Sequence, residues 1–173
     1  MRISYCTWGM MNVGIEEAIP EIARIGYSAI ELAVTPNWPT DLVTLDAAKR
    51  ARIRQLLDQY HLSLSAVAGH TTMTESDAEK NAANFQRLRD SVDLTAELTR
   101  PGEPAIFVSL IGGGMEEWDA KRELVAERVR ALGDYASSRG VMLAVEPHSG
   151  TSFDTPEKAT WLMEQLNHPG VRL

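Results

Sequence analysis

Strand-like and helix-like segments alternate along the chain, and this alternation constrains the fold more than any other feature of the sequence. The helix-like segments carry apolar residues at spacings of three and four, which is typical of helices that bury one face. Successive βα units with helical crossovers predict a parallel sheet. We expect its strands near residues 2–6, 28–33, 62–68, 105–110 and 141–146, with a sixth beginning at Val171.

Two architectures are built from such units: the closed (β/α)8 barrel and the open doubly wound sheet. The connection after the first strand, Thr7 to Gly14, lacks the G-x-G-x-x-G turn of dinucleotide-binding open sheets. Polar residues also follow several strands in succession, as on the catalytic face of a barrel, which favours the TIM barrel. Eight units need about 250 residues, whereas this chain has 173. We therefore expect one partial barrel domain over residues 1–173, with roughly the first five and a half units.

The last helical segment, after Phe153, has a recognisable start signal. Asp154 is expected to cap the helix, and Glu157, three residues later, would close a capping box.

Charge and cysteine content narrow the partners and the compartment. With 17 Lys and Arg against 24 Asp and Glu, the net charge is −7, which argues against nucleic acid as the main partner. The single cysteine, Cys6, rules out an internal disulfide and is typical of a reducing cytoplasm. No apolar stretch approaches the length of a membrane span and no signal peptide is visible, so we expect a cytoplasmic protein away from membranes.

The segment Val141–His148 carries the strongest functional signal. Six strand-like residues end on Glu146, and Pro147 stops the strand. A carboxylate at the end of a buried strand is costly unless it is paired or binds a metal. We therefore predict Glu146 as a catalytic or metal-binding residue, the alternative being a salt bridge to an arginine.

Two further candidates end earlier strands. His70 follows Gly69 after the third strand, where imidazole suits either metal ligation or a hydrogen bond to a substrate hydroxyl, the alternative being a histidine in a surface loop. Glu31 alternates with Ile30 and Leu32 in the second strand, which would turn its carboxylate away from the helices. It could orient a neighbouring ligand or hold a sugar hydroxyl, or form a structural ion pair with Arg2 or another basic residue.

Two residues in connections complete the candidate set. Trp8 follows the first strand and could supply an apolar wall for a sugar ring, or simply plug the barrel rim. His148 lies two residues beyond Glu146 and could reach a substrate, or stand in a solvated loop.

Four segments, in this order and spacing, resemble the sugar phosphate isomerase/epimerase family, whose xylose-isomerase-like TIM barrel is shared with the endonuclease-four type of DNA-repair enzyme. They are Ser4–Gly9, Gly26–Leu32, Ala66–His70 and Leu143–His148. The resemblance implies that Glu146 binds a divalent metal and acts as acid/base at a sugar carbon. It also implies further ligands from strands six to eight, so the metal site in this chain is expected to be incomplete. Mn²⁺, Mg²⁺, Co²⁺ or Zn²⁺ would then bind to it weakly or not at all.

The leading functional hypothesis is a metal-dependent isomerase or epimerase of a sugar or sugar phosphate, with a small-molecule sugar as its partner. A metal-dependent dehydratase of cyclic polyols would use the same groups. The endonuclease is disfavoured because the fourth strand ends at Leu110 without a histidine. A non-catalytic partial barrel is the third possibility, and its open strand edges would promote a homo-oligomer.

Overall fold

The computed structural model describes residues 2–173 and contains one sheet of six strands. Every neighbouring pair is parallel, and the order across the sheet is the order along the chain. This confirms the predicted parallel sheet and contradicts a doubly wound order, which would reverse direction from a central strand. The strands are β1 (Ser4–Cys6), β2 (Ala29–Ala33), β3 (Ser63–Ala68), β4 (Ile106–Leu110), β5 (Met142–Glu146) and β6 (Val171–Arg172).

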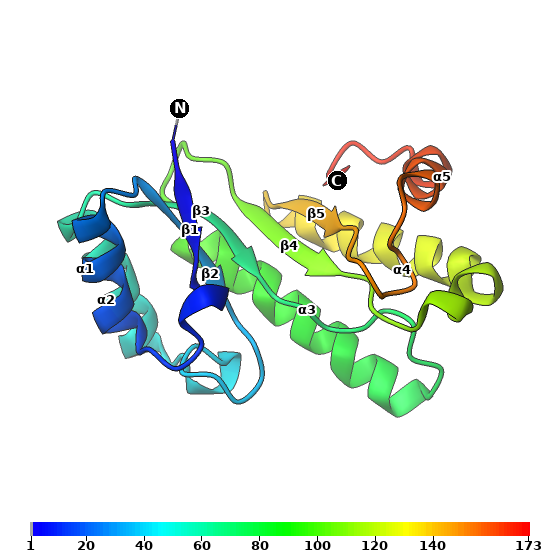
Figure 1. Cartoon of the computed structure of the whole chain (residues 1–173), viewed down its shortest axis with the longest axis horizontal. Coiled ribbons are helices and arrows are strands. Elements are labelled where there is room, and N and C mark those ends of the chain that lie inside the picture. Colours follow the sequence, from blue (N-terminus) through cyan, green and yellow to red (C-terminus); the bar gives the residue numbers. More distant parts are fainter. Residues whose placement is uncertain (1) are drawn as a thin grey trace.

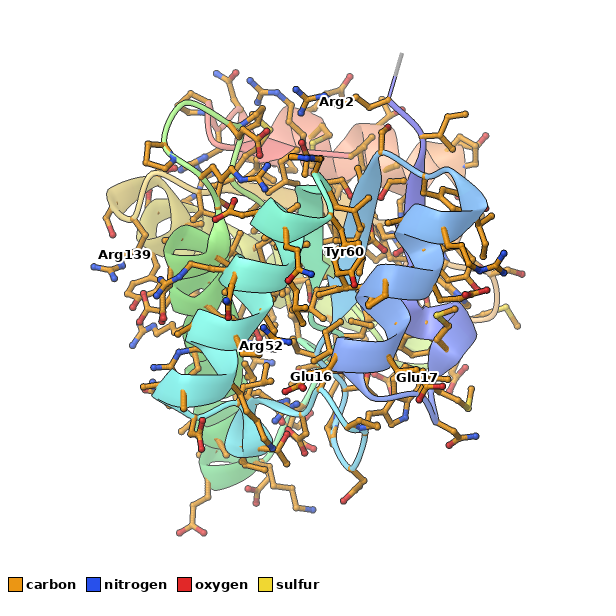
Figure 2. The ribbon with its side chains drawn as sticks, turned by 90° about the vertical axis from the view of Figure 1, so that its left-hand side faces the viewer. Arg2, Glu16, Glu17, Arg52, Tyr60 and Arg139 are labelled. Carbon is orange, nitrogen blue, oxygen red and sulfur yellow. The ribbon has the colours of Figure 1, made fainter. Side chains whose placement is uncertain are left out.

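A helix follows each of the first five strands, as Figure 1 shows. In Figure 2, α1 (Ile15–Ile25) and α2 (Ala47–Gln59) lie side by side, with Glu16 and Glu17 at the start of α1 and Tyr60 just past the end of α2. Three 3₁₀ turns lie in the connections: η1 (Thr7–Met10), η2 (Leu42–Thr44) and η3 (Met115–Glu117). The helices are α1 (Ile15–Ile25), α2 (Ala47–Gln59), α3 (Ala78–Leu98), α4 (Trp118–Ser138) and α5 (Pro156–Leu166).

The hydrophobic core lies between the sheet and these helices. Strand residues that alternate toward the helices are fully buried, among them Leu32, Phe107 and Val145. Their partners come from the apolar helix faces, for example Ile19 and Leu88. The burial of one strand face by the helices leaves the opposite face of the sheet as the inner wall of the partial barrel.

A bulge in β3 shapes that inner wall. Ile30 pairs with Leu64, but the next residue, Glu31, pairs with Ala66, so Ser65 is an extra residue in the ladder. The Ser65 hydroxyl bonds the Ile30 carbonyl oxygen at 3.0 Å and therefore satisfies an acceptor beside the bulge. Because Glu31 stands beside a residue no larger than alanine, its carboxylate has room on the inner wall.

Both ends of the sheet are strand edges. Within the described residues, β1 pairs only with β2, and β6 pairs only with β5. Ile3 beside β1 and Met142 on β5 are exposed large apolar side chains. No helix among residues 2–173 is both long and apolar enough to cross a membrane.

The predicted cap of α5 is wrong by one residue. Thr155 is the N-cap, and its hydroxyl accepts a hydrogen bond from the Lys158 amide. Asp154 instead pairs with the Lys158 ammonium at 2.7 Å. A nearby lysine therefore outcompetes the helix terminus for the aspartate, and Glu157 closes no capping box onto Asp154.

Candidate active site

The C-terminal ends of β1, β2, β3 and β5 each carry one polar side chain with reactive chemistry. Cys6 ends β1 and Glu146 ends β5, while Glu31 is the middle residue of β2 and lies level with Cys6. His70 follows β3 after one glycine. Since parallel strands end at a common edge, these groups share the inner wall of the sheet near that edge.

Cys6 and Glu31 are direct neighbours across the β1–β2 pair. Burial raises the pKa of the Cys6 thiol to about 12. Its hydrogen bond to Glu31 and the charges of Glu31 and Glu146 also raise this pKa, whereas a hydrogen bond from the Trp8 backbone amide lowers it. The thiol therefore stays protonated and donates to the Glu31 carboxylate. The sequence pattern does not predict this pair, because strand register cannot be read from either segment alone.

The alternative partner proposed for Glu31, Arg2, lies elsewhere. Its guanidinium bonds the Ser63 hydroxyl at 2.8 Å and the Glu103 carboxylate at 3.2 Å. Ser63 begins β3, so this cluster sits at the opposite end of the strands. Glu31 forms no salt bridge within the described residues, which leaves its carboxylate to the Cys6 thiol and to solvent.

His70 is partly buried beside Trp8, with ring centroids 5.4 Å apart in an edge-to-face arrangement. Burial lowers the pKa of the imidazole below its usual value; the charges of Glu146 and Glu31 oppose this, and His148 adds to it. The electrostatic influence of these three residues places them in the same surroundings as His70.

Glu146 is exposed, and this corrects the premise that its strand ends in a buried carboxylate. The alternation itself is as predicted: Val145 is buried against the helices and Glu146 turns to the inner wall. Among residues 2–173 no strand pairs with the free edge of β6, and this part of the inner wall is open to solvent. The alternative of an arginine salt bridge is not observed, since Glu146 has no charged partner among residues 2–173.

His148 is also exposed, and its Nδ1 lies 3.0 Å from the Ser149 carbonyl oxygen. Its connection folds back on itself, because the His148 amide donates to the Phe153 carbonyl oxygen at 2.9 Å. His148 therefore occupies the rim beyond β5 and contributes to the environment of His70 through its charge.

A second tryptophan joins Trp8. Trp38, in the connection after β2, packs against Trp8 with ring centroids 4.7 Å apart and planes tilted by 47°. Trp8 remains 43% exposed. The two indoles and His70 form one aromatic wall beside the carboxylates. Trp38 lies five residues past Ala33, the end of β2, so its position gives no strand-end signal of the kind that drew attention to Trp8.

The donor set fits part of a metal site. The Glu146 carboxylate, exposed and unpaired, is a suitable ligand for a divalent cation. The described residues, however, contain no group of three or more His, Cys, Asp or Glu placed to hold one ion. A complete site therefore needs ligands from outside these residues.

A groove of about 650 Å³ lies on the helix side of the sheet, between α2 and α3. Across it, Arg50 pairs with Glu97 at 2.9 Å and Arg87 pairs with Asp41 at 2.9 Å. Both of its arginines are thus paired within the chain, and none of the candidate residues lines the groove. The groove is a seam between packed helices, separate from the inner wall.

The unusual thiol gives a direct test of this geometry. At pH 8.5, alkylation of Cys6 by iodoacetamide should be at least tenfold slower than for a free thiol, because little thiolate exists far below a pKa of about 12. Glu31→Gln should accelerate it by removing a neighbouring charge, whereas Glu164→Gln on α5 should not. Mass spectrometry reads the result cleanly, since Cys6 is the single cysteine. Equal rates in all three proteins would contradict the Cys6–Glu31 pairing.

A parallel sheet in chain order, outer helices and polar groups at the carboxyl ends of its strands define the TIM-barrel class, here as a partial barrel. The chain belongs to the family described as xylose isomerase-like TIM barrel, whose sequence profile matches residues 19–173.

Curated relatives divide between two activities. The chain is 27% identical over 169 residues to an L-ribulose 3-epimerase of Methylomonas sp. (strain DH-1), an alignment covering 92% of this chain and 56% of that protein. It is 26% identical over 179 residues to an inosose dehydratase of Geobacillus thermodenitrificans (strain NG80-2), covering 94% and 53%. The chain thus spans about half the length of these relatives.

Among solved structures, a xylose isomerase-like TIM barrel protein from Mycobacterium smegmatis, in complex with magnesium, superposes with a TM-score of 0.74 at 22% identity. The match covers 98% of this chain and 62% of that one. At this identity the superposition demonstrates the shared fold, and it extends over nearly all of the chain.

Proposed function

We propose that the chain forms the first part of a divalent-metal-dependent sugar epimerase or isomerase, with Glu146 as metal ligand and acid/base. The observation that carries this proposal is the Glu146 carboxylate: unpaired and exposed at the end of β5, on the same inner wall as Glu31 and His70. The family membership and the epimerase relative support the reaction class.

In this proposal each candidate residue of the chain has a separate role. Glu146 removes or returns the proton on the carbon next to the sugar carbonyl. Glu31, held by Cys6, accepts a hydrogen bond from a sugar hydroxyl, and His148 approaches from the rim. Trp8 packs against the C–H face of the sugar. A divalent cation, when bound, holds adjacent sugar oxygens and acidifies the C–H bond.

A dehydratase is the second candidate, favoured by the inosose dehydratase that aligns with 94% of the chain. It begins with the same proton removal next to a carbonyl. The reactions then differ: an epimerase returns a proton to the other face of that carbon, whereas a dehydratase expels the neighbouring hydroxyl as water.

Incubation with Mn²⁺ in D₂O distinguishes these possibilities. A form of the protein that also carries the remaining metal ligands is mixed separately with L-ribulose, its phosphate ester and inosose, and products are followed by proton NMR and mass spectrometry. We expect deuterium on the carbon next to the carbonyl, together with a new epimer, from L-ribulose or its phosphate. A product lighter by one water from inosose would instead establish the dehydratase. If neither change occurs with any of the substrates, the result would favour the non-catalytic partial barrel.

A further inference from the structure

The backbone that carries His70 is held tightly by β4. The Gly69 amide donates to the Val108 carbonyl oxygen at 3.0 Å, and the Ser109 hydroxyl donates to the Gly69 carbonyl oxygen at 3.1 Å. A side chain at position 69 would meet the Phe107 ring and the Ser91 hydroxyl, each at 2.8 Å. Glycine therefore lets the chain lie directly on β4, which fixes where the imidazole begins.

One nitrogen of the His70 ring, Nδ1, has a defined hydrogen-bond partner. The Leu110 backbone amide donates to His70 Nδ1 at 3.3 Å. A backbone N–H is only a donor, so Nδ1 must be the acceptor, and the proton of the neutral ring resides on Nε2. The assignment follows from the chemistry of the partner rather than from a choice between two tautomers.

The other ring nitrogen, Nε2, lies on the opposite edge of the imidazole and has different surroundings. Nε2 has no hydrogen-bond partner within residues 2–173, while the ring shares its environment with Glu31, Glu146 and His148. Burial favours the neutral ring. A neutral N–H without a protein acceptor, next to carboxylates on the inner wall, is suited to an uncharged oxygen of a ligand.

We propose that His70 donates a hydrogen bond from Nε2–H to a hydroxyl or carbonyl oxygen of the sugar, and that it does not coordinate the metal. The sugar as ligand rests on the proposed function; the exclusion from metal binding does not. Coordination through Nε2 would require the proton on Nδ1, where it would point at the Leu110 N–H and break that hydrogen bond.

The tautomer is measured in the metal-free chain by long-range ¹H–¹⁵N NMR, with His70→Gln identifying the His70 signals among the four histidines. We expect a protonated Nε2 and an unprotonated Nδ1, unchanged when Zn²⁺ is added. A proton on Nδ1, or a switch to it with Zn²⁺, would overturn the proposal. These outcomes need no turnover, so they are independent of the proposed enzyme activity.

The ligand is tested with L-ribulose and with ribitol, a polyol that cannot react. Either should shift the His70 Nε2 resonance, and no shift with both would refute the substrate contact. In a protein that converts the sugar, His70→Phe should lower kcat/KM about a hundredfold. His70→Gln, which keeps an N–H near the position of Nε2, should retain at least a tenth of wild-type kcat/KM. Both variants should keep the wild-type metal content; loss of metal would place His70 among the ligands.

Discussion

In a form of the protein that carries the remaining metal ligands, Glu146→Gln should reduce sugar turnover by about a hundredfold to ten-thousandfold while leaving the fold intact. Glutamine keeps the shape of the side chain but neither transfers a proton nor carries the charge that a divalent cation requires. Stability should change by no more than about 0.5 kcal/mol, because Glu146 is exposed and its carboxylate has no charged partner among residues 2–173.

Deuterium exchange at the carbon next to the carbonyl, urea unfolding and metal content together separate these effects. Glu164→Gln, the same chemical change on the exposed side of α5, is the matched control and should behave as wild type. Exchange within threefold of wild type in Glu146→Gln would remove Glu146 from the reaction. Exchange that is lost together with the metal, and that returns at excess Mn²⁺, would instead limit its role to metal binding.

Phe107→Ala should lower the free energy of unfolding by about 3–5 kcal/mol. Phe107 is fully buried in β4 at the centre of the core, so truncation removes its apolar contacts and leaves a cavity. The expected fall in Tm is about 10 °C for a chain of this size. The change also reaches the site, because the Phe107 ring packs against Gly69 and supports the backbone before His70.

Urea and thermal unfolding measure the loss, and Val43→Ala is the control, since Val43 is 84% exposed and should change stability by less than about 0.5 kcal/mol. The His70 resonances should broaden or shift in Phe107→Ala but not in Val43→Ala. A loss below about 1 kcal/mol would mean that the core relaxes into the cavity and that β4 does not depend on this ring.

The local pattern of the sequence determined the elements and their order. The alternation of Val145 toward the helices and Glu146 away from them is a property of consecutive residues in a strand, and the structure reproduces it. The parallel sheet in chain order likewise follows from repeated βα units with short connections. The cap of α5 was misjudged because Lys158 competes for Asp154, and such competition depends on side-chain geometry.

Only the tertiary structure decided what surrounds each candidate residue. The pairing of Cys6 with Glu31 depends on strand register, and the contact of Trp8 with Trp38 joins two separate connections. The state of His70 depends on the Leu110 amide, 40 residues away in the chain. Burial, pKa and tautomer are set by groups that are close in space but distant in sequence. A strand pattern can therefore place a carboxylate or an imidazole at the end of a sheet, and the packing of neighbouring strands determines what it can do there.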